Sequence, residues 1–221
     1  MHLRPLALAG AFVAALALAG PALAVRVHVR VEGAGATLFG ATEPLVTPVA
    51  GTWSPPDGPP LALGTETPLG ALERASRRAE LYYRVQSTGF GPYVDRIGRV
   101  AASGTTGWVY KVNGVSPPVG ADKYELREGD RVLWYFAPFG PGGGPRTLEV
   151  VRAGRACFRA YSRDDAGRRR AEEDVVFRVD GRRTAVRRGR VCPFGHWHTL
   201  RATKAGFVRS QAVGRTRARR A

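Results

Sequence analysis

Two aromatic segments separated by two turn signals constrain the fold of this chain most strongly. Residues 108–112 and 131–137 are rich in Trp, Tyr, Phe and Val, which are residue types that strands favour. Asn113-Gly114 follows the first segment directly, and both residues tolerate positive φ, so the pair predicts a hairpin turn. Residues 128–130 (Glu-Gly-Asp) predict a second turn before the second segment. We therefore expect two aromatic strands here.

The segments around this block predict the rest of an α+β domain. Val25 to Val31 alternates apolar and polar residues, which indicates a strand with one face in the core. One helix is expected after Thr67 as N-cap, with Pro68 at the first helical position, where no N–H is needed. Gly140 to Pro145 predicts a linker. We therefore expect residues 25–143 to form an α+β domain, a β-grasp-like mixed sheet with one helix.

The region after the linker is predicted to be a small all-β sandwich domain over residues 144–211. Its expected strands are short and separated by turns, at residues 146–151, 156–161, 175–179 and 198–203. Arg215 to Ala221 has no apolar periodicity, and residues 212–221 are assigned to a basic tail.

Cys157 and Cys192 are the two cysteines of the chain, and both fall in the second predicted domain. In an exported protein an even number of cysteines predicts a disulfide, and two cysteines allow one pairing. A Cys/His metal site is the alternative, but its ligands would need closer spacing. We expect the disulfide, because the core of so small a domain is marginal by itself.

The formal net charge of +16 is unevenly distributed. Residues 25–143 hold 12 Lys and Arg against 11 Asp and Glu, a net of +1, whereas residues 144–221 hold 21 against 7, a net of +14. A genome that encodes Arg where others encode Lys is a competing explanation for the many arginines. It does not account for the shortage of acidic residues in this region. Residues 144–221 are therefore the region expected to bind polyanions.

The first 24 residues have the pattern of a cleavable signal peptide. Leu6 to Gly20 is an apolar run after a weakly basic start, and Ala22 and Ala24 are small residues at the positions that signal peptidase recognises. A retained membrane anchor is the alternative, but Gly20-Pro21 interrupts the run before it reaches spanning length. We expect cleavage after Ala24, no transmembrane span in the mature chain, and a protein that is secreted, extracellular or associated with the cell envelope.

The aromatic block also carries a family resemblance. Residues 107–136 (GWVYKVNGVSPPVGADKYELREGDRVLWYF), with the helix and FGPYVDRIG upstream, resemble a bacterial secreted domain family of unknown function related to the C-terminal domain of transcobalamin and intrinsic factor. The matching positions are Gly107, Trp108, Tyr110, Val112, Asn113 and Gly114, then Gly129, Asp130, Trp134 and Tyr135. The resemblance implies a domain that caps a corrinoid, although this chain has no room for the helical barrel that completes the site in the animal carriers.

The second region has a weaker resemblance to small carboxypeptidase-regulatory or surface-adhesin β-domains. The segments VDGRRTAVRRG and LRATKAGFVRS carry it. This resemblance agrees with the all-β sandwich expected from the strand spacing.

The aromatic strands are the best candidate for a binding site. Large aromatic side chains with a polar group suit flat organic ligands. Alternation places Trp134 and Tyr135 on opposite faces, so both faces of that strand are apolar. One face must be core, and the other is either covered or open to a planar ligand. The predicted ligand-binding residues are Tyr93, Trp108, Tyr110, Asn113, Trp134 and Tyr135.

Catalytic and metal signals are weak, and we expect a protein that is not an enzyme and has no resident cofactor or metal. His196 and His198 would lie on one face of a strand, but a third ligand is not evident. Asp95 and Asp130 lie near the aromatic block, and nothing pairs them as acid and base.

Two functions remain for a non-catalytic chain of this kind. The first is a binding protein for a small flat organic ligand of the corrinoid type. The alternative is an envelope-associated structural or adhesion protein that binds anionic polymers through guanidinium groups, which suit phosphate and carboxylate. Few aromatic residues lie among the arginines, so no specific nucleic-acid partner is expected.

Overall fold

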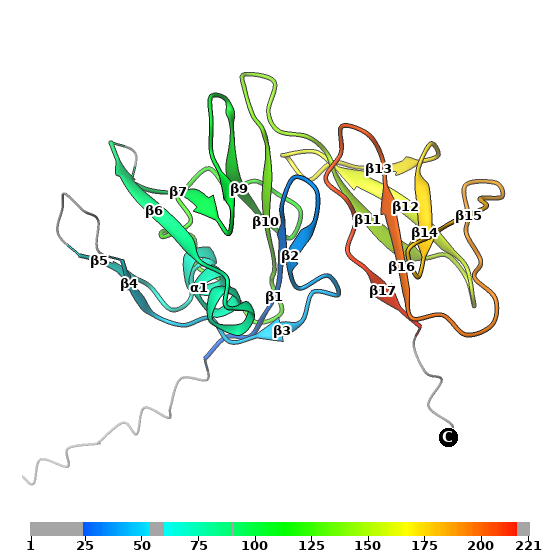
Figure 1. The fold of residues 1–221 in the computed structure, drawn as a ribbon, viewed down its shortest axis with the longest axis horizontal. Helices are drawn as coiled ribbons and strands as arrows, with labels where there is room; N and C mark the ends of the chain where they lie inside the picture. The colour runs from blue at the N-terminus through cyan, green and yellow to red at the C-terminus, as the bar shows by residue number, and fades with distance from the viewer. Residues whose placement is uncertain (1–23, 54–59, 90, 216–221) are drawn as a thin grey trace, which may run out of the picture.

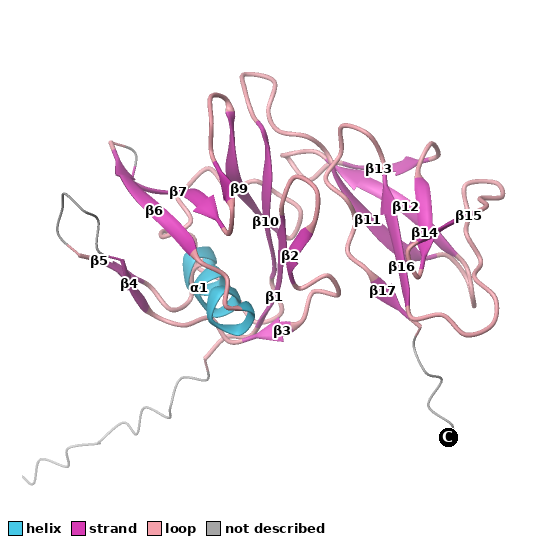
Figure 2. Ribbon diagram, viewed as in Figure 1, coloured by secondary structure: helices cyan, strands magenta, loops and turns pink. Residues whose placement is uncertain are grey.

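The computed structural model describes residues 24–53, 60–89 and 91–215. It is mostly β, with one helix and several small sheets in the part described (Figure 2). The predicted signal peptide lies outside the described residues except for Ala24, and so does the end of the predicted tail, residues 216–221. Figure 1 shows two β-rich halves side by side, with the chain passing once from the first to the second.

A mixed sheet forms the centre of the first half. Its strand order is β2-β1-β10-β9, and β3 pairs beside β1. The two central strands are parallel, with Val31 opposite Trp134, whereas β10 and β9 are antiparallel, with Trp134 opposite Tyr110. The bounds are β1 Val27–Glu32, β2 Thr37–Phe39, β3 Leu45–Val46, β9 Thr106–Val112 and β10 Arg131–Pro138.

The two predicted turns of the aromatic block are present. Asn113 and Gly114 have φ of 52° and 82°, and Val112 and Val115 exchange backbone hydrogen bonds of 2.9 Å across them. The chain does not continue as a strand after this turn, because β9 pairs with β10 instead. In the second turn, an oxygen of Asp130 accepts the backbone N–H of Arg127 at 2.9 Å. A long loop thus separates the two strands of the hairpin.

The helix α1 (Pro68–Ala79) begins where the sequence predicts. The Thr67 hydroxyl oxygen accepts the backbone N–H of Gly70 at 3.1 Å, and Pro68 occupies the first turn. The helix ends at Glu80, which has left-handed backbone geometry. Its apolar side packs on the central sheet through buried residues that include Leu69, Leu72 and Ala75.

Two smaller sheets complete the first half. One holds β6 (Tyr83–Thr88), β7 (Gly91–Ile97) and β8 (Val100–Ala101), and the other is the hairpin of β4 (Gly51–Trp53) and β5 (Leu61–Leu63). Buried residues of β7 share one apolar core with α1 and with one face of the central sheet. That face is therefore covered by α1 and β7 together.

The second half has two sheets around one apolar core. Leu148, Phe158, Phe177 and Leu200 are among the buried residues of this core. The strand orders are β11-β12-β13 and β15-β14-β16-β17. The bounds are β11 Thr147–Arg152, β12 Phe158–Arg163, β13 Arg169–Glu172, β14 Val176–Val179, β15 Arg182–Thr184, β16 Thr199–Thr203 and β17 Val213–Gly214.

Two features of this half complete or correct the expectations. The predicted disulfide is confirmed: Cys157 and Cys192 are bonded, with their Cα atoms 4.1 Å apart. The expected tail starts too early, because Val213–Gly214 pairs with β16 and Ala212 is buried. The apolar residues Ala212 and Val213 explain the difference, since Val213 packs on the second core and the Ala212 N–H donates to the Ala41 carbonyl at 2.7 Å.

The halves pack against each other through the second face of the central sheet. Leu133, Tyr135 and Ala137 of β10 form a small buried cluster with Val208 of the second half. The polar face of β1 also lies in this contact, where Arg30 is 3% exposed and Glu32 is 1% exposed. Both faces of the central sheet are therefore covered.

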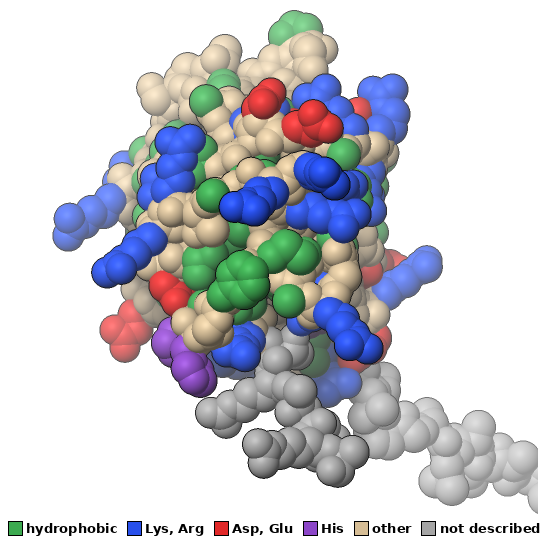
Figure 3. All heavy atoms as spheres, turned by 90° about the vertical axis from the view of Figure 1, so that its right-hand side faces the viewer, with side chains coloured by type: hydrophobic (Ala, Val, Ile, Leu, Met, Phe, Trp, Pro, Cys, Tyr) green, Lys and Arg blue, Asp and Glu red, His purple; other side chains and the backbone are tan. Residues whose placement is uncertain are grey.

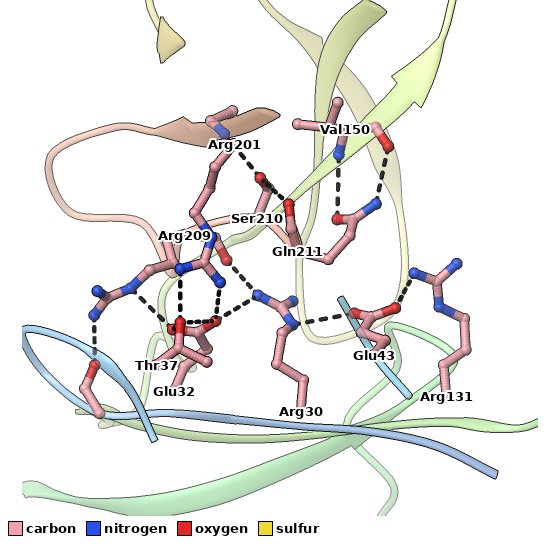
Figure 4. Close-up of polar contacts among 12 residues, drawn as sticks. Arg30, Glu32, Thr37, Glu43, Arg131, Val150, Arg201, Arg209, Ser210 and Gln211 are labelled. Carbon is pink, nitrogen blue, oxygen red and sulfur yellow. Dashed lines mark hydrogen bonds and ion pairs between the residues drawn. The ribbon is translucent and has the colours of Figure 1, made fainter. Parts of the chain in front are cut away.

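Glu32 organises the polar part of this contact (Figure 4). Its carboxylate pairs with Arg201 at 2.8 Å and with Arg209 at 2.9 Å, both from the second half. From the first half, Arg30 lies 3.1 Å away and the Thr37 hydroxyl donates at 2.9 Å. A single buried carboxylate thus draws together three guanidinium groups from two parts of the chain.

Candidate ligand pocket

An open pocket of about 370 Å³ lies beside β9, the edge strand of the central sheet. Its walls come from β7, β9, β10, the loops that follow β9 and β10, and one turn of the second half. Five of the six predicted ligand-binding residues line it: Tyr93, Trp108, Tyr110, Trp134 and Tyr135.

The two tryptophans are fixed parts of the wall and belong to the core. Trp108 and Trp134 are each 2% exposed. The Trp108 indole N–H donates to the Val100 carbonyl at 2.9 Å, and the Trp134 indole N–H donates to the Pro68 carbonyl at 3.1 Å. Because each indole is both packed and hydrogen-bonded, its position does not depend on a ligand.

Both faces of the aromatic strands are covered in the structure. The face of Trp108 and Trp134 lies against α1 and β7, and the face of Tyr135 lies against the second half, where Tyr135 is 1% exposed. The alternative of an open aromatic face is therefore excluded. The second half of the chain covers the face that the helix leaves free. The open pocket lies where these rings meet the β9 edge.

The remaining two tyrosines give the pocket an uncharged polar rim. The Tyr110 hydroxyl donates to the Val119 carbonyl at 2.7 Å, and burial raises the pKa of Tyr110 to about 12. Burial also raises the pKa of Tyr93, although the backbone N–H of Trp108 at its hydroxyl opposes the shift. Both phenols are therefore neutral in ordinary buffers.

Gly107 is needed for this arrangement. A Cβ at Gly107 would lie 2.0 Å from the Tyr93 hydroxyl oxygen. The close approach of Tyr93 to the β9 backbone therefore requires glycine at this position. The Gly-Trp pair of the sequence motif is explained by this contact.

Asn113 does not line the pocket. Its side-chain N–H donates to Asp130 at 2.7 Å, and its oxygen accepts the Arg131 backbone N–H at 3.0 Å. It ties together the two predicted turns. Asn113 therefore has a structural role in these turns and lies outside the pocket that the other five predicted residues line.

The second half contributes a carboxylate that sequence reasoning missed. Asp165 lines the pocket and accepts the Gly144 backbone N–H at 2.7 Å. Lys111, which is fully buried, places its Nζ 3.0 Å from an Asp165 oxygen. The Ser116 hydroxyl donates to the same oxygen at 3.2 Å. The Gly144 to Asp165 contact also attaches the predicted linker to the second half.

The pKa values of this pair follow from burial and pairing. Burial lowers the pKa of Lys111, while Asp165 opposes that shift. Burial by itself would raise the pKa of Asp165, but the Gly144 N–H, Lys111 and Ser116 together lower it below the usual value. Asp165, at this end of the pocket, therefore has Lys111 as its ion-pair partner.

The sequence around Asp165 does not predict its contact with Lys111. Asp165 lies in an Asp-Asp-Ala-Gly stretch that is typical of a turn, far along the chain from β9. The one signal is Lys111 itself, a charged residue inside an aromatic strand. Its partner could not be identified without the tertiary structure.

A separate surface of the second half is rich in exposed arginines (Figure 3). Arg168, Arg169 and Arg170 pair with nearby carboxylates. A second group of exposed arginines forms no ion pair with any residue in the described ranges. It consists of Arg178, Arg182, Arg183, Arg187, Arg188 and Arg190.

The expected histidine pair does not gain a third ligand in the part of the chain that is described. His198 lies 3.7 Å from Asp180 through its Nδ1 atom. Residues 24–53, 60–89 and 91–215 contain no group of three His, Cys, Asp or Glu side chains placed to hold a metal ion. Over the same residues, no helix is both long and apolar enough to cross a membrane.

Comparison with known proteins finds a match to the model of a domain family of unknown function. Residues 66–137 match the model of a domain of unknown function (DUF4430). The match covers α1 and the strands β6 to β10 almost to the end, and hence the aromatic block. No curated protein matches the chain.

Proposed function

We propose that this chain is a secreted, non-enzymatic binding protein whose pocket at the β9 edge takes a flat organic group. The proposal rests on one observation: five of the six residues predicted to bind a ligand line the same open pocket. Its walls are aromatic, its phenols are neutral and its one carboxylate is paired. Such a site favours an uncharged planar group with a few hydrogen-bonding atoms.

The ligand class we propose is of the corrinoid type. Support comes from the resemblance of residues 107–136 to the C-terminal domain of transcobalamin and intrinsic factor, and from the match to a family of unknown function. The central parallel pair with one packed helix supports assignment of residues 25–143 to the β-grasp class. A pocket of about 370 Å³ is at the small end for a drug-sized ligand, so it would take one edge of a corrinoid.

The test is a cobalamin titration of the mature chain, residues 25–221, followed by visible absorbance and calorimetry at low and high salt. We expect binding that is insensitive to salt, because the pocket walls carry little net charge. Phe139→Ala is the diagnostic variant, since Phe139 lines the pocket but is 41% exposed and is not needed for the core. It should weaken binding about tenfold.

Tyr82→Ala is the matched control, because Tyr82 is an aromatic residue that is 63% exposed and lies outside the pocket. It should leave the affinity unchanged. No spectral change or heat at concentrations on the order of tens of micromolar would exclude the corrinoid ligand. Equal losses in both variants would exclude the pocket as the binding site.

The arginine-rich half supports a second candidate function. We propose attachment to anionic material of the cell envelope, through the exposed arginines that have no ion-pair partner among the described residues. Guanidinium groups bind phosphate and carboxylate oxygens in bidentate geometry. In this arrangement residues 144–214 form a basic β-sandwich domain that holds the pocket near the envelope.

A further inference from the structure

Phe194 is exposed on a part of the second half that is held firmly in place. Its side chain is 92% exposed, more than any other large hydrophobic side chain in the described ranges. Cys192 on one side is bonded to Cys157. Trp197 on the other side packs edge-to-face on Phe158 at 5.7 Å between ring centroids. Its exposure is therefore built into the loop, which is anchored at both ends.

Cationic side chains lie beside this apolar tip. Arg155 and Arg215 line a pocket of about 270 Å³ together with Phe194. Residues 175–200, which lead into the same loop, hold six Arg against one Asp. Figure 3 views the molecule from the side of the second half and shows Lys and Arg side chains around a hydrophobic area. The orange loops at the right of Figure 1 lie on this face.

We propose that this face docks on the surface of an anionic lipid bilayer. The proposal rests on the second candidate function and names its partner. Arginines gain from the negative surface potential and the phosphate groups of such a bilayer. Phe194 gains by entering the boundary between headgroups and acyl chains. A soluble anionic polymer would use the arginines but would leave Phe194 in water, so the exposed ring favours the bilayer.

The experiment is sedimentation of the mature chain with lipid vesicles. One set contains phosphatidylcholine alone, and the other contains phosphatidylcholine mixed with phosphatidylglycerol. We expect binding to the anionic vesicles, little binding to the neutral ones, and a steep loss with rising salt. Phe194→Ala should weaken binding to the anionic vesicles about tenfold, because it removes the apolar group that enters the lipid.

Two matched controls separate docking from general changes in charge or hydrophobicity. Tyr82→Ala removes an aromatic residue that is 63% exposed on the first half, and it should leave vesicle binding unchanged. A triple Arg→Gln variant on the proposed face should abolish binding, whereas a triple variant of equal charge on the first half should retain most of it. The two sets are Arg182, Arg187 and Arg188, and Arg78, Arg99 and Arg127.

Soluble polyphosphate in the same assay distinguishes the proposals. Binding to polyphosphate without binding to anionic vesicles would overturn the bilayer proposal and leave anionic attachment standing. Binding to neither would overturn both. Equal binding of Phe194→Ala and the parent chain to anionic vesicles, or equal losses in the two triple variants, would also overturn docking through this face.

Discussion

Glu172 is a buried carboxylate in β13 whose charge is stabilised by three groups. Its side chain is 3% exposed, and Lys204 and Arg170 each place a nitrogen 2.7 Å from it. The Ser162 hydroxyl donates to it at 2.7 Å. Burial would raise the pKa of Glu172, but these donors together lower it to about 2. The charge of a single residue thus links β12, β13 and the segment after β16.

Acid should destabilise the protein partly through this residue. The pKa of Glu172 in the folded state is about 2, below the usual value of 4.5. The stabilisation is therefore complete above about pH 4.5 and is lost as the pH falls toward 2. We expect Glu172→Gln to remove about 3 kcal/mol of the pH dependence of the free energy of unfolding. Urea denaturation between pH 5 and 2 measures it.

The exposed neighbour Glu173 provides the control for this prediction. Glu173→Gln should leave the acid dependence close to that of the parent chain. If Glu172→Gln has the same acid dependence as the parent, then the three contacts do not stabilise its charge.

At the scale of elements, the second half depends on short strands and one covalent link. Several of its strands are brief, such as β15 with three residues and β17 with two. The disulfide joins positions 35 residues apart, next to a bridge between Phe158 and Val191. It connects the loop that follows β15 to the start of β12.

Removing the disulfide should destabilise the second half more than the first. The chain-entropy model gives about 3 to 4 kcal/mol for a loop of this length. We expect the double variant Cys157→Ala, Cys192→Ala to unfold at a lower denaturant concentration by a corresponding amount. Reductant should shift the parent chain in the same direction and have no effect on the double variant. Unchanged unfolding in both cases would mean that the strands of this half are sufficient without the link.

At the scale of the whole molecule, the two halves share a buried charged contact. Glu32 from the first half lies 2.8 Å from Arg201 and 2.9 Å from Arg209 of the second half. The polar face of β1 is therefore directed at the partner half rather than at solvent. The same packing covers Tyr135 and brings Asp165 to the pocket. Interface and pocket consequently depend on each other.

Loss of the Glu32 charge should weaken the coupling between the halves. Glu32→Gln leaves three guanidinium groups without their common carboxylate, and we expect a cost of about 3 to 5 kcal/mol. Calorimetry should show one cooperative transition for the parent chain and two for the variant. Glu128→Gln breaks an exposed pair with Arg26 and should cost less than about 1 kcal/mol. Similar traces for both variants would show that the buried network does not couple the halves.

The sequence was informative wherever a signal is local. Asn113-Gly114 predicted a turn that needs positive φ, and Thr67-Pro68 predicted the start of the helix. Alternation predicted β1, and strand-favouring aromatic and β-branched residues predicted β9 and β10. Even the residues of the pocket were largely identified, because large aromatic residues in two adjacent strands must lie near one another. Polar strands such as β13 were missed, since their residues show no apolar alternation.

The sequence by itself therefore determined the helix, the apolar strands and the aromatic character of the site, because these follow from neighbours along the chain. It determined the disulfide because the chain has two cysteines, which allow one pairing. Only the tertiary structure decided which aromatic surfaces are covered. The packing of the second half onto β10 buried one face, left access at the β9 edge and supplied Asp165 to Lys111. The physical reason is that burial and ion pairing depend on contacts between residues far apart in sequence, which no local pattern encodes.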